Sequence, residues 1–509
     1  MRKILSLGLL CVAAVLSASV FASDAVPAVG DPAAAPDPSV MSEAYYKIWN
    51  DDVQKAIDER IEKYRKADGK VELTDVKPGT DVKVEQISHE FIFGAHIFNF
   101  NQLGTNERNA KYKNMFGTLF NSASIAFYWK KFELEPGKPR FKTEFRDTPE
   151  FWNQVEEPWK QTHWRRPSSD QVVEFCESKG IRLHGHTIIW GNQTWQRPDW
   201  LWTYVADQFP EEKKVLESTN EKRKSMSEEE IYKLAPHYFD TMNSLYWNRI
   251  AELAKHYGGR LNSWDVVNES ATDYHGKAHT GNKVTKSNYG HLMPGDYTYN
   301  SFQLAGKLFP AEVKLNINDY ANNQNYVNQV KDLLAEGCKI DIMGSQMHLF
   351  NPQQTLDIAA GKPIQTPDGV LGTMKTLAQA GLPIHLSEIT ITAPNDNATG
   401  RAIQAIVARN LYRLWFSVPE MMGITWWNTV DACGAPGEPT TSGLFTRNMD
   451  PKPSFYALNN LINKEWKTNL TQKADGESVS VSFRGFKGKY RVSWTDKNGN
   501  AQTKEIVVK

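Results

Sequence analysis

The sequence predicts an α/β protein built on a (β/α)8 barrel, a closed ring of eight parallel strands that alternate with helices. Eight short apolar segments are separated by enough chain for a helix each. Polar residues gather at the C-terminal ends of these segments, where such barrels carry their sites. No Gly-rich phosphate turn follows the first segment, which argues against an open doubly wound sheet.

The chain begins with the pattern of a secretory signal peptide over residues 1–22. Arg2 and Lys3 precede an apolar stretch, and a small-residue cleavage site ends at Ala22. A membrane anchor is the alternative, but small residues interrupt the apolar run and a polar segment follows. We therefore expect a secreted or periplasmic protein with no membrane association after cleavage. Residues 23–41, rich in Pro, Ala and Asp, are predicted to be a linker.

Two small additions are expected beside the barrel. Residues 42–87 are predicted to form an N-terminal helix and β extension, because apolar residues recur at three- and four-residue spacing up to residue 66. Short strands follow. Residues 466–509 alternate apolar and polar side chains between Gly-containing turns, which predicts a small C-terminal antiparallel β module.

The barrel itself is expected to occupy residues 88–465. Its eight predicted strands cover residues 91–100, 124–129, 182–190, 263–269, 312–319, 340–348, 383–391 and 423–431. Helical periodicity is clearest at residues 238–257, 325–337 and 401–416. The long polar loop 272–297 after the fourth strand is predicted to shape one side of the cleft.

Two carboxylates end predicted strands: Glu269 in SWDVVNES and Glu388 in PIHLSEITI. Such a pair is the minimum for glycoside hydrolysis, in which one carboxyl protonates the leaving oxygen and the other attacks the anomeric carbon or activates water. Burial raises the pKa of a carboxyl and suits it to donate a proton near neutral pH. Other two-carboxylate chemistries remain open on this evidence alone.

Composition and charge indicate which class of ligand the protein binds. The chain has 16 Trp and 19 Tyr, which can serve as stacking platforms for sugar rings. Its formal net charge is zero and no basic stripe appears, so nucleic acid is not expected. Three cysteines beyond the signal segment, Cys176, Cys338 and Cys433, are far apart and lack metal-type spacing. We expect a monomer that binds a polysaccharide and needs no cofactor.

A metal-dependent hydrolase is one competing hypothesis. The histidines available to it are His184, His186, His275, His279 and His348. Because His184 and His186 alternate along one strand, we expect them to point to opposite faces and not to share a metal ion. No metal site is therefore predicted.

Six motifs occur in order at the predicted strand ends: HGHTIIW (184–190), WDVVNES (264–270), NINDY (316–320), GSQMH (344–348), HLSEITI (385–391) and ITWWNTVD (424–431). In this order they resemble glycoside hydrolase family 10, which consists mainly of retaining endo-β-1,4-xylanases on a (β/α)8 barrel. The resemblance covers about residues 88–465.

The resemblance implies that Glu269 is the acid/base and Glu388 the nucleophile, about 5–5.5 Å apart as retention requires. It implies that Asn268 hydrogen-bonds the sugar 2-hydroxyl and that His348 holds Glu388. The other substrate-binding residues that it implies are Lys130, His186, Trp190, Tyr320, Gln346 and Trp427.

Some positions depart from the family pattern. Ala126 and Phe127 stand where the family usually has Glu-Asn, Thr390 where it commonly has Asp, and Ala435 where it has a second Trp. Altered substrate choice follows more naturally from these changes than lost catalysis. We expect a secreted retaining hydrolase of β-1,4-linked xylan or a related decorated polysaccharide, acting by two-carboxylate double displacement. The alternatives are a catalytically weak carbohydrate-binding barrel and a retaining β-glycosidase of non-xylan specificity.

Overall fold

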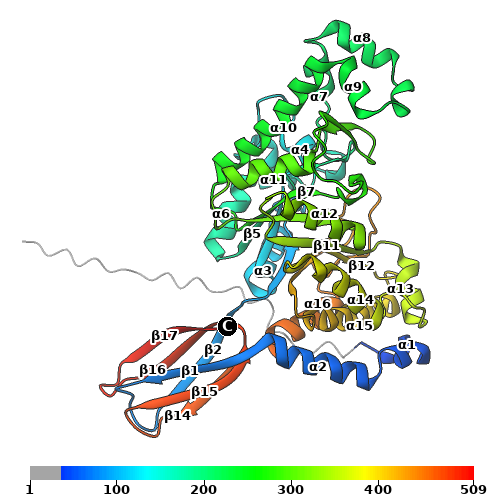
Figure 1. Cartoon of the computed structure of the whole chain (residues 1–509). Coiled ribbons are helices and arrows are strands. Elements are labelled where there is room, and N and C mark those ends of the chain that lie inside the picture. Colours follow the sequence, from blue (N-terminus) through cyan, green and yellow to red (C-terminus); the bar gives the residue numbers. More distant parts are fainter. Residues whose placement is uncertain (1–35) are drawn as a thin grey trace, which may run out of the picture.

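The computed structural model describes residues 36–509. The predicted signal peptide and residues 23–35 of the predicted linker lie outside the described residues. Eight parallel strands form a barrel with helices around it (Figure 1). The ring closes because β10 (Lys314–Asp319) pairs with β11 on one side and with β7 on the other. The predicted (β/α)8 barrel is confirmed.

The other barrel strands are β3 (Ile92–His96), β4 (Ser122–Ala126), β5 (Arg182–His186), β7 (Ser263–Asn268), β11 (Ile342–Leu349), β12 (Ile384–Ile391) and β13 (Met421–Trp426). Several boundaries differ from the prediction, and two of the differences have a clear local cause. The second strand ends at Ala126 because Trp129 already begins a helix. The third strand stops after His186, and a two-residue strand β6 (Ile189–Trp190) resumes the pairing with β7.

The barrel helices are α3 (Asn106–Thr118), α4 (Trp129–Phe132), α5 (Pro149–Trp152), α6 (Ser169–Lys179), α7 (Leu201–Ala206), α8 (Pro210–Ser218), α9 (Glu228–Leu234), α10 (Pro236–Tyr257), α11 (Tyr297–Leu308), α12 (Gln324–Ala335), α13 (Pro352–Ala359), α14 (Pro367–Leu377), α15 (Ala398–Phe416) and α16 (Pro453–Asn460). Side-chain caps set several starts, since Thr105, Asn323 and Asn397 each accept a hydrogen bond from a backbone N–H of the first turn. None of the helices in the described part of the chain combines the length and apolar character needed to span a lipid bilayer.

A large insertion follows β6 and extends away from the barrel (Figure 1). It contains α7, α8 and α9, which Figure 1 shows away from the ring of strands. A hairpin of β8 (Val284–Lys286) and β9 (Leu292–Pro294) comes from the loop after β7 and packs against α9 and α10. The predicted loop 272–297 thus contains a hairpin that packs on the helices beside it.

Two helices, and not the single one predicted, precede the first strands. α1 (Glu43–Ile48) ends at Trp49, and α2 (Asp51–Arg65) begins after Asn50, whose side chain accepts from the Val53 N–H over 3.0 Å. A strong cap in mid-pattern separates the two helices although the apolar spacing continues. α2 then lies along α15, where Asp58 pairs with Arg413 over 2.7 Å.

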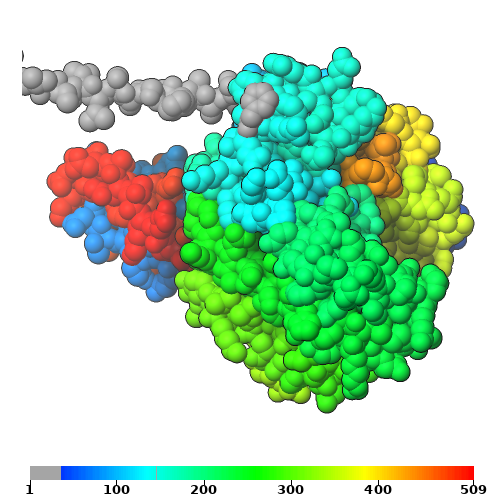
Figure 2. All heavy atoms as spheres, turned by 90° about the horizontal axis from the view of Figure 1, so that it is seen from above, coloured from blue at the N-terminus to red at the C-terminus, as the bar shows by residue number. Residues whose placement is uncertain are grey.

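The N-terminal strands and the C-terminal module form one unit, which corrects the prediction of two separate additions. β1 (Lys66–Leu73) pairs with β15 (Val479–Phe486), and β2 (Asp81–His89) lies between β14 (Asn469–Lys473) and β16 (Gly488–Thr495), with β17 (Ala501–Val508) at the edge. Figure 2 shows the blue strands of the N-terminal extension beside the red C-terminal strands on one flank of the barrel.

This small β unit has its own apolar core. Val71, Val82, Val481 and Val492 are buried between its two sheets, and Tyr490 is fully buried with its hydroxyl donating to the Phe486 carbonyl. β1, β2, β15 and β16 each bury one face, and neither segment could cover that face without strands from the other end of the chain.

Candidate active site

Glu269 follows directly after β7 at the C-terminal end of the barrel. Its φ of 55° is left-handed, a conformation that non-glycine residues seldom adopt. The backbone is held there by the Glu269 N–H, which donates to the Asn318 carbonyl over 2.7 Å. The side chain accepts from the Trp190 indole N–H at Oε2 and from the Gln346 amide at Oε1, both over 3.0 Å. The carboxyl is therefore fixed in position at both oxygens.

Electrostatics favour the protonated form of Glu269. Burial and the nearby Glu388 charge raise its pKa to about 7, although hydrogen bonds from Gln346 and Tyr289 oppose the shift. Tyr289 belongs to the turn between β8 and β9, so the loop after β7 does reach this carboxyl. A carboxyl with this pKa can both donate and accept a proton near neutral pH.

Glu388 lies within β12 and is 5% exposed. Hydrogen-bond donors surround its carboxylate. The Asn318 amide donates to Oε1 over 2.8 Å, and Nε2 of His348 lies 3.3 Å from Oε2. Nε2 of His186 lies 3.7 Å from Oε1. Donors of this kind stabilise an ionised carboxylate and orient its lone pairs.

The partner of His348 is a hydroxyl, at a position where the family resemblance leads us to expect a carboxylate. Its Nδ1 lies 2.9 Å from Oγ1 of Thr390. A threonine hydroxyl can donate to Nδ1, which places the imidazole proton on Nε2, the nitrogen that faces Glu388. Thr390 therefore orients His348 so that Nε2 faces Glu388 as a donor.

His184 and His186 point to the same side of β5, and the prediction that they face apart is wrong. His184 Nε2 and His186 Nδ1 both lie 2.8 Å from Oδ2 of Asp265. Residues two apart on a strand share a face because the side-chain period is two. Their shared partner is a carboxylate, and no group of three His, Cys, Asp or Glu side chains within residues 36–509 is arranged to hold a metal ion.

The buried Asp265 ties this pair to the site. The hydrogen bonds and charges of the two histidines outweigh burial and keep the pKa of Asp265 far below its usual range. Burial lowers the pKa of His186. The Glu388 and Asp265 carboxylates raise it by more than burial lowers it, so the pKa of His186 lies above its ordinary value. The raised pKa favours a proton on His186, and a proton there adds positive charge near Glu388.

Glu269, Glu388 and His348 line one pocket of about 770 Å³, which we call the carboxylate pocket. Six further residues predicted for the site line it: His186, Trp190, Asn268, Tyr320, Gln346 and Trp427. Asn268 has its oxygen occupied by the Asn318 amide over 2.8 Å, which leaves its NH₂ group for a ligand. Trp427 is 4% exposed and Tyr320 is 48% exposed, so the aromatic lining runs from floor to rim.

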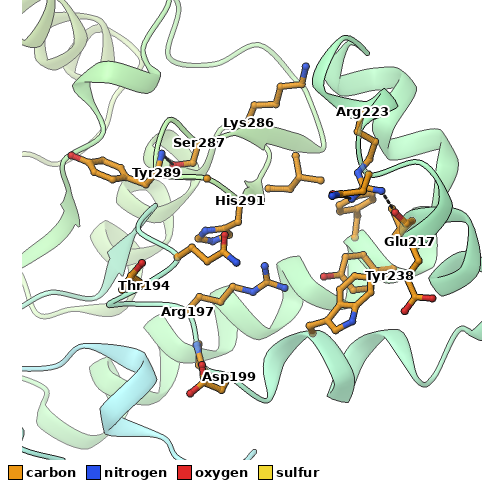
Figure 3. Close-up of a pocket in the computed structure, with 18 of the residues that line it drawn as sticks. Thr194, Arg197, Asp199, Glu217, Arg223, Tyr238, Lys286, Ser287, Tyr289 and His291 are labelled. Carbon is orange, nitrogen blue, oxygen red and sulfur yellow. Dashed lines mark hydrogen bonds between the residues drawn. The ribbon is translucent and has the colours of Figure 1, made fainter.

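Lys130, which we predicted to bind substrate, does not line the carboxylate pocket. Its Nζ pairs with Asp199 over 2.6 Å and lines a second pocket of about 1170 Å³ beside the insertion. Figure 3 shows Asp199 at the edge of this pocket and Arg197 and His291 within it. The β4 strand ends at Ala126, and the helical turn that follows turns Lys130 away.

Apolar side chains occupy the positions where the family pattern has Glu-Asn. Ala126 packs with Phe98, Tyr128 and Trp427 at the pocket wall. Phe127 is fully buried against Trp264, with ring centroids 4.6 Å apart, and so does not reach the pocket.

Several pocket residues were not found from the sequence. Tyr128, Arg165, Arg166 and Glu438 line the pocket and come from loops. Arg165 and Arg166 stand directly before α6, far along the chain from β4, and no local pattern indicates their direction. Asn318 was visible as a polar strand end, but its contact with both Asn268 and Glu388 depends on strand neighbours.

The model of Glycosyl hydrolase family 10 matches residues 85–461. The chain is 25% identical over 302 residues to Endo-1,4-beta-xylanase A of Thermoanaerobacterium saccharolyticum, which covers 57% of this chain and 22% of that protein. It is 23% identical over 303 residues to Exoglucanase XynX of Acetivibrio thermocellus, covering 57% and 24%.

The match thus spans less than a quarter of the length of these two curated relatives. Among solved structures, the endo-1,4-beta-xylanase from Caldicellulosiruptor owensensis is 17% identical with a TM-score of 0.49, and the match covers 73% of this chain and 97% of that one.

Proposed function

The chain belongs to glycosyl hydrolase family 10, and we propose that it is a retaining glycoside hydrolase of β-1,4-linked xylan or a related decorated polysaccharide. The observation that carries the proposal is the contrast between two neighbouring carboxyls. Glu269 has a pKa raised to about 7, while the Glu388 carboxylate accepts a hydrogen bond from the Asn318 amide and faces Nε2 of His348 at 3.3 Å. Opposite protonation states are what a double displacement needs.

In the first step Glu388 attacks the anomeric carbon while Glu269 protonates the leaving glycosidic oxygen. A covalent glycosyl–enzyme bond forms as the glycosidic bond breaks. In the second step Glu269, now ionised, takes a proton from water, and that water releases the sugar from Glu388. Asn318 and His348 orient the Glu388 carboxylate for attack in the first step, and they face it again when the second step releases it.

A retaining β-glycosidase of non-xylan specificity is the second candidate. The apolar Ala126 and the absence of Lys130 from the carboxylate pocket favour it, since both positions would otherwise supply polar contacts to a sugar. One relative also carries the name exoglucanase. A catalytically weak binding barrel is disfavoured because both carboxyls and their hydrogen-bond partners are present.

The test is product release from glucuronoxylan, arabinoxylan, mixed-linkage glucan and cellulose, with Glu269→Gln and Glu388→Gln beside the unaltered protein. Glu388→Gln should abolish activity on every substrate. Glu269→Gln should abolish activity on polysaccharides yet still form the glycosyl–enzyme from aryl glycosides whose leaving group needs no proton. NMR of the first product should show the β-anomer. Release of the α-anomer would overturn the retaining mechanism.

We also propose that the protein is exported. The signal pattern of residues 1–22 supports a secreted or periplasmic destination for the processed chain, which then acts as a monomer. N-terminal sequencing of the exported protein should begin at Ser23. An uncleaved chain retained in the cytoplasm would contradict this part of the proposal.

A further inference from the structure

Arg166 is a cation that lines the carboxylate pocket without an acidic partner. Its side chain is only 8% exposed. Nη1 donates to the Arg165 carbonyl over 2.8 Å, and Nε is a buried nitrogen with no hydrogen-bond partner. Within residues 36–509, no carboxylate forms an ion pair with Arg166, whereas the neighbouring Arg165 has one. A buried, unpaired cation is costly unless something compensates it.

Aromatic rings supply only part of that compensation. The guanidinium carbon lies 3.8 Å from the centre of the Tyr128 ring and 5.1 Å from that of Phe98. Such stacking stabilises a cation modestly and leaves its edge free to donate. Burial lowers the pKa of Arg166 to about 10, so it stays charged at neutral pH.

The other charges in this part of the pocket are already engaged. Arg165 donates from Nη2 to the Asn428 side-chain oxygen over 2.9 Å, and Nη1 lies 3.5 Å from Oε2 of Glu438. The same Glu438 oxygen accepts from the Asn428 amide and from the Ala435 N–H, both over 2.7 Å. Glu438 thus holds the 433–438 loop onto Arg165. Its charge also favours the charged form of Arg166, but it makes no ion pair with that guanidinium, whose edge remains for a ligand.

Arg166 lines the same pocket as Glu269 and Glu388, and a chain of contacts through Tyr128 links it to the reacting centre. The Tyr128 hydroxyl lies 3.0 Å from Nε2 of His186, which in turn lies 3.7 Å from the Glu388 carboxylate. A sugar in the carboxylate pocket would therefore pass within reach of the guanidinium. A planar guanidinium recognises a carboxylate better than a hydroxyl because it makes charge-assisted hydrogen bonds to it.

We propose that Arg166 binds the carboxylate of a uronic acid unit, so that the protein selects acidic glycans over neutral ones. This inference rests on the proposed function and names the substrate feature that the same pocket recognises. The uronate can be a branch on the glycan or a unit of its main chain, since both present the same carboxylate.

The test measures binding by calorimetry in the Glu269→Gln background, where hydrolysis does not interfere. The ligands are a xylo-oligosaccharide with one glucuronic acid branch, a main-chain uronic oligosaccharide, and each of these after chemical reduction of the carboxyl to an alcohol. At least one acidic ligand should bind about tenfold or more tightly than its reduced form. The ligand with that preference identifies branch or main-chain recognition.

Adding Arg166→Gln should reduce the preference to about onefold, while Arg166→Lys should keep part of it. Lys224→Gln, which removes an exposed cation from the second pocket, should leave the preference unchanged and controls for general charge effects. Equal binding of acidic and reduced ligands with Arg166 intact would overturn the inference and leave the proposed function standing. Binding of none would overturn both. The comparison with Arg166 intact decides the matter even if Arg166→Gln does not fold.

Discussion

The indole N–H of Trp190 donates to Oε2 of Glu269 over 3.0 Å, so the aromatic wall of the pocket also holds the proposed acid. A donor favours the ionised carboxylate, against the burial that favours the protonated form. Trp190→Phe keeps the ring and removes the donor. We expect the pKa of Glu269 to rise and the alkaline limb of kcat/KM to move to higher pH, with turnover reduced roughly tenfold. An alkaline limb that stays in place would contradict this role.

Activity should fall above about pH 7. Glu269 must hold a proton in the first step, and its pKa is raised to about 7 by burial and by Glu388. Deprotonation above that pH removes the acid, so kcat/KM should decrease about tenfold per pH unit. In Glu388→Gln the like charge is absent, and direct NMR titration should show the Glu269 pKa lowered. An unchanged pKa would mean that burial alone sets it.

The same shift should influence stability. The folded-state pKa of Glu269 lies above its unfolded value, so the folded protein binds more protons between about pH 4.5 and 7, and stability falls as pH rises through that window. Glu269→Gln has no charge to bury. At pH 8 its free energy of unfolding should exceed that of the unaltered protein by about 1–3 kcal/mol, and the gain should vanish near pH 4. Denaturant unfolding at both pH values measures this.

Thr390 should matter for catalysis more than for stability. Its hydroxyl lies 2.9 Å from His348 Nδ1 and sets which nitrogen faces Glu388. Thr390→Val keeps the volume and removes the hydroxyl, so a loss of about 1–2 kcal/mol of transition-state stabilisation, or roughly 5–30-fold in kcat/KM, is expected. Thr390→Ser is the matched control and should retain most activity. If Thr390→Val and Thr390→Ser behave alike, the hydroxyl does not orient the histidine.

The N-terminal strands β1 and β2 should need the C-terminal strands in order to fold and stay soluble. Deleting residues 469–509 removes the partners of both β1 and β2 and exposes Val82 and Val84. Exposed strand edges and an uncovered apolar face favour aggregation. We expect little soluble protein. Deleting only residues 501–509, the edge strand β17, should lower Tm by a few degrees and leave the protein soluble. A soluble, fully stable barrel after the longer deletion would show that the β unit is dispensable.

Local patterns were enough to predict the barrel and the two carboxyls at its strand ends. The shared face of His184 and His186 also follows from the two-residue period of a strand, so that error lay in our interpretation and not in the sequence. The break between α1 and α2 is different, because Asn50 can cap a helix or lie within one, and only the packing of α2 on α15 decides between them.

What the sequence determined by itself is the order of apolar strands and the chemical groups that end them, because burial and strand period are local properties. What only the tertiary structure decided is which distant groups meet. Strands from both ends of the chain share one core, Lys130 lies in a second pocket, and Arg166 enters the carboxylate pocket from a loop. The direction of a loop side chain depends on the path of the surrounding backbone, and no local periodicity records that path.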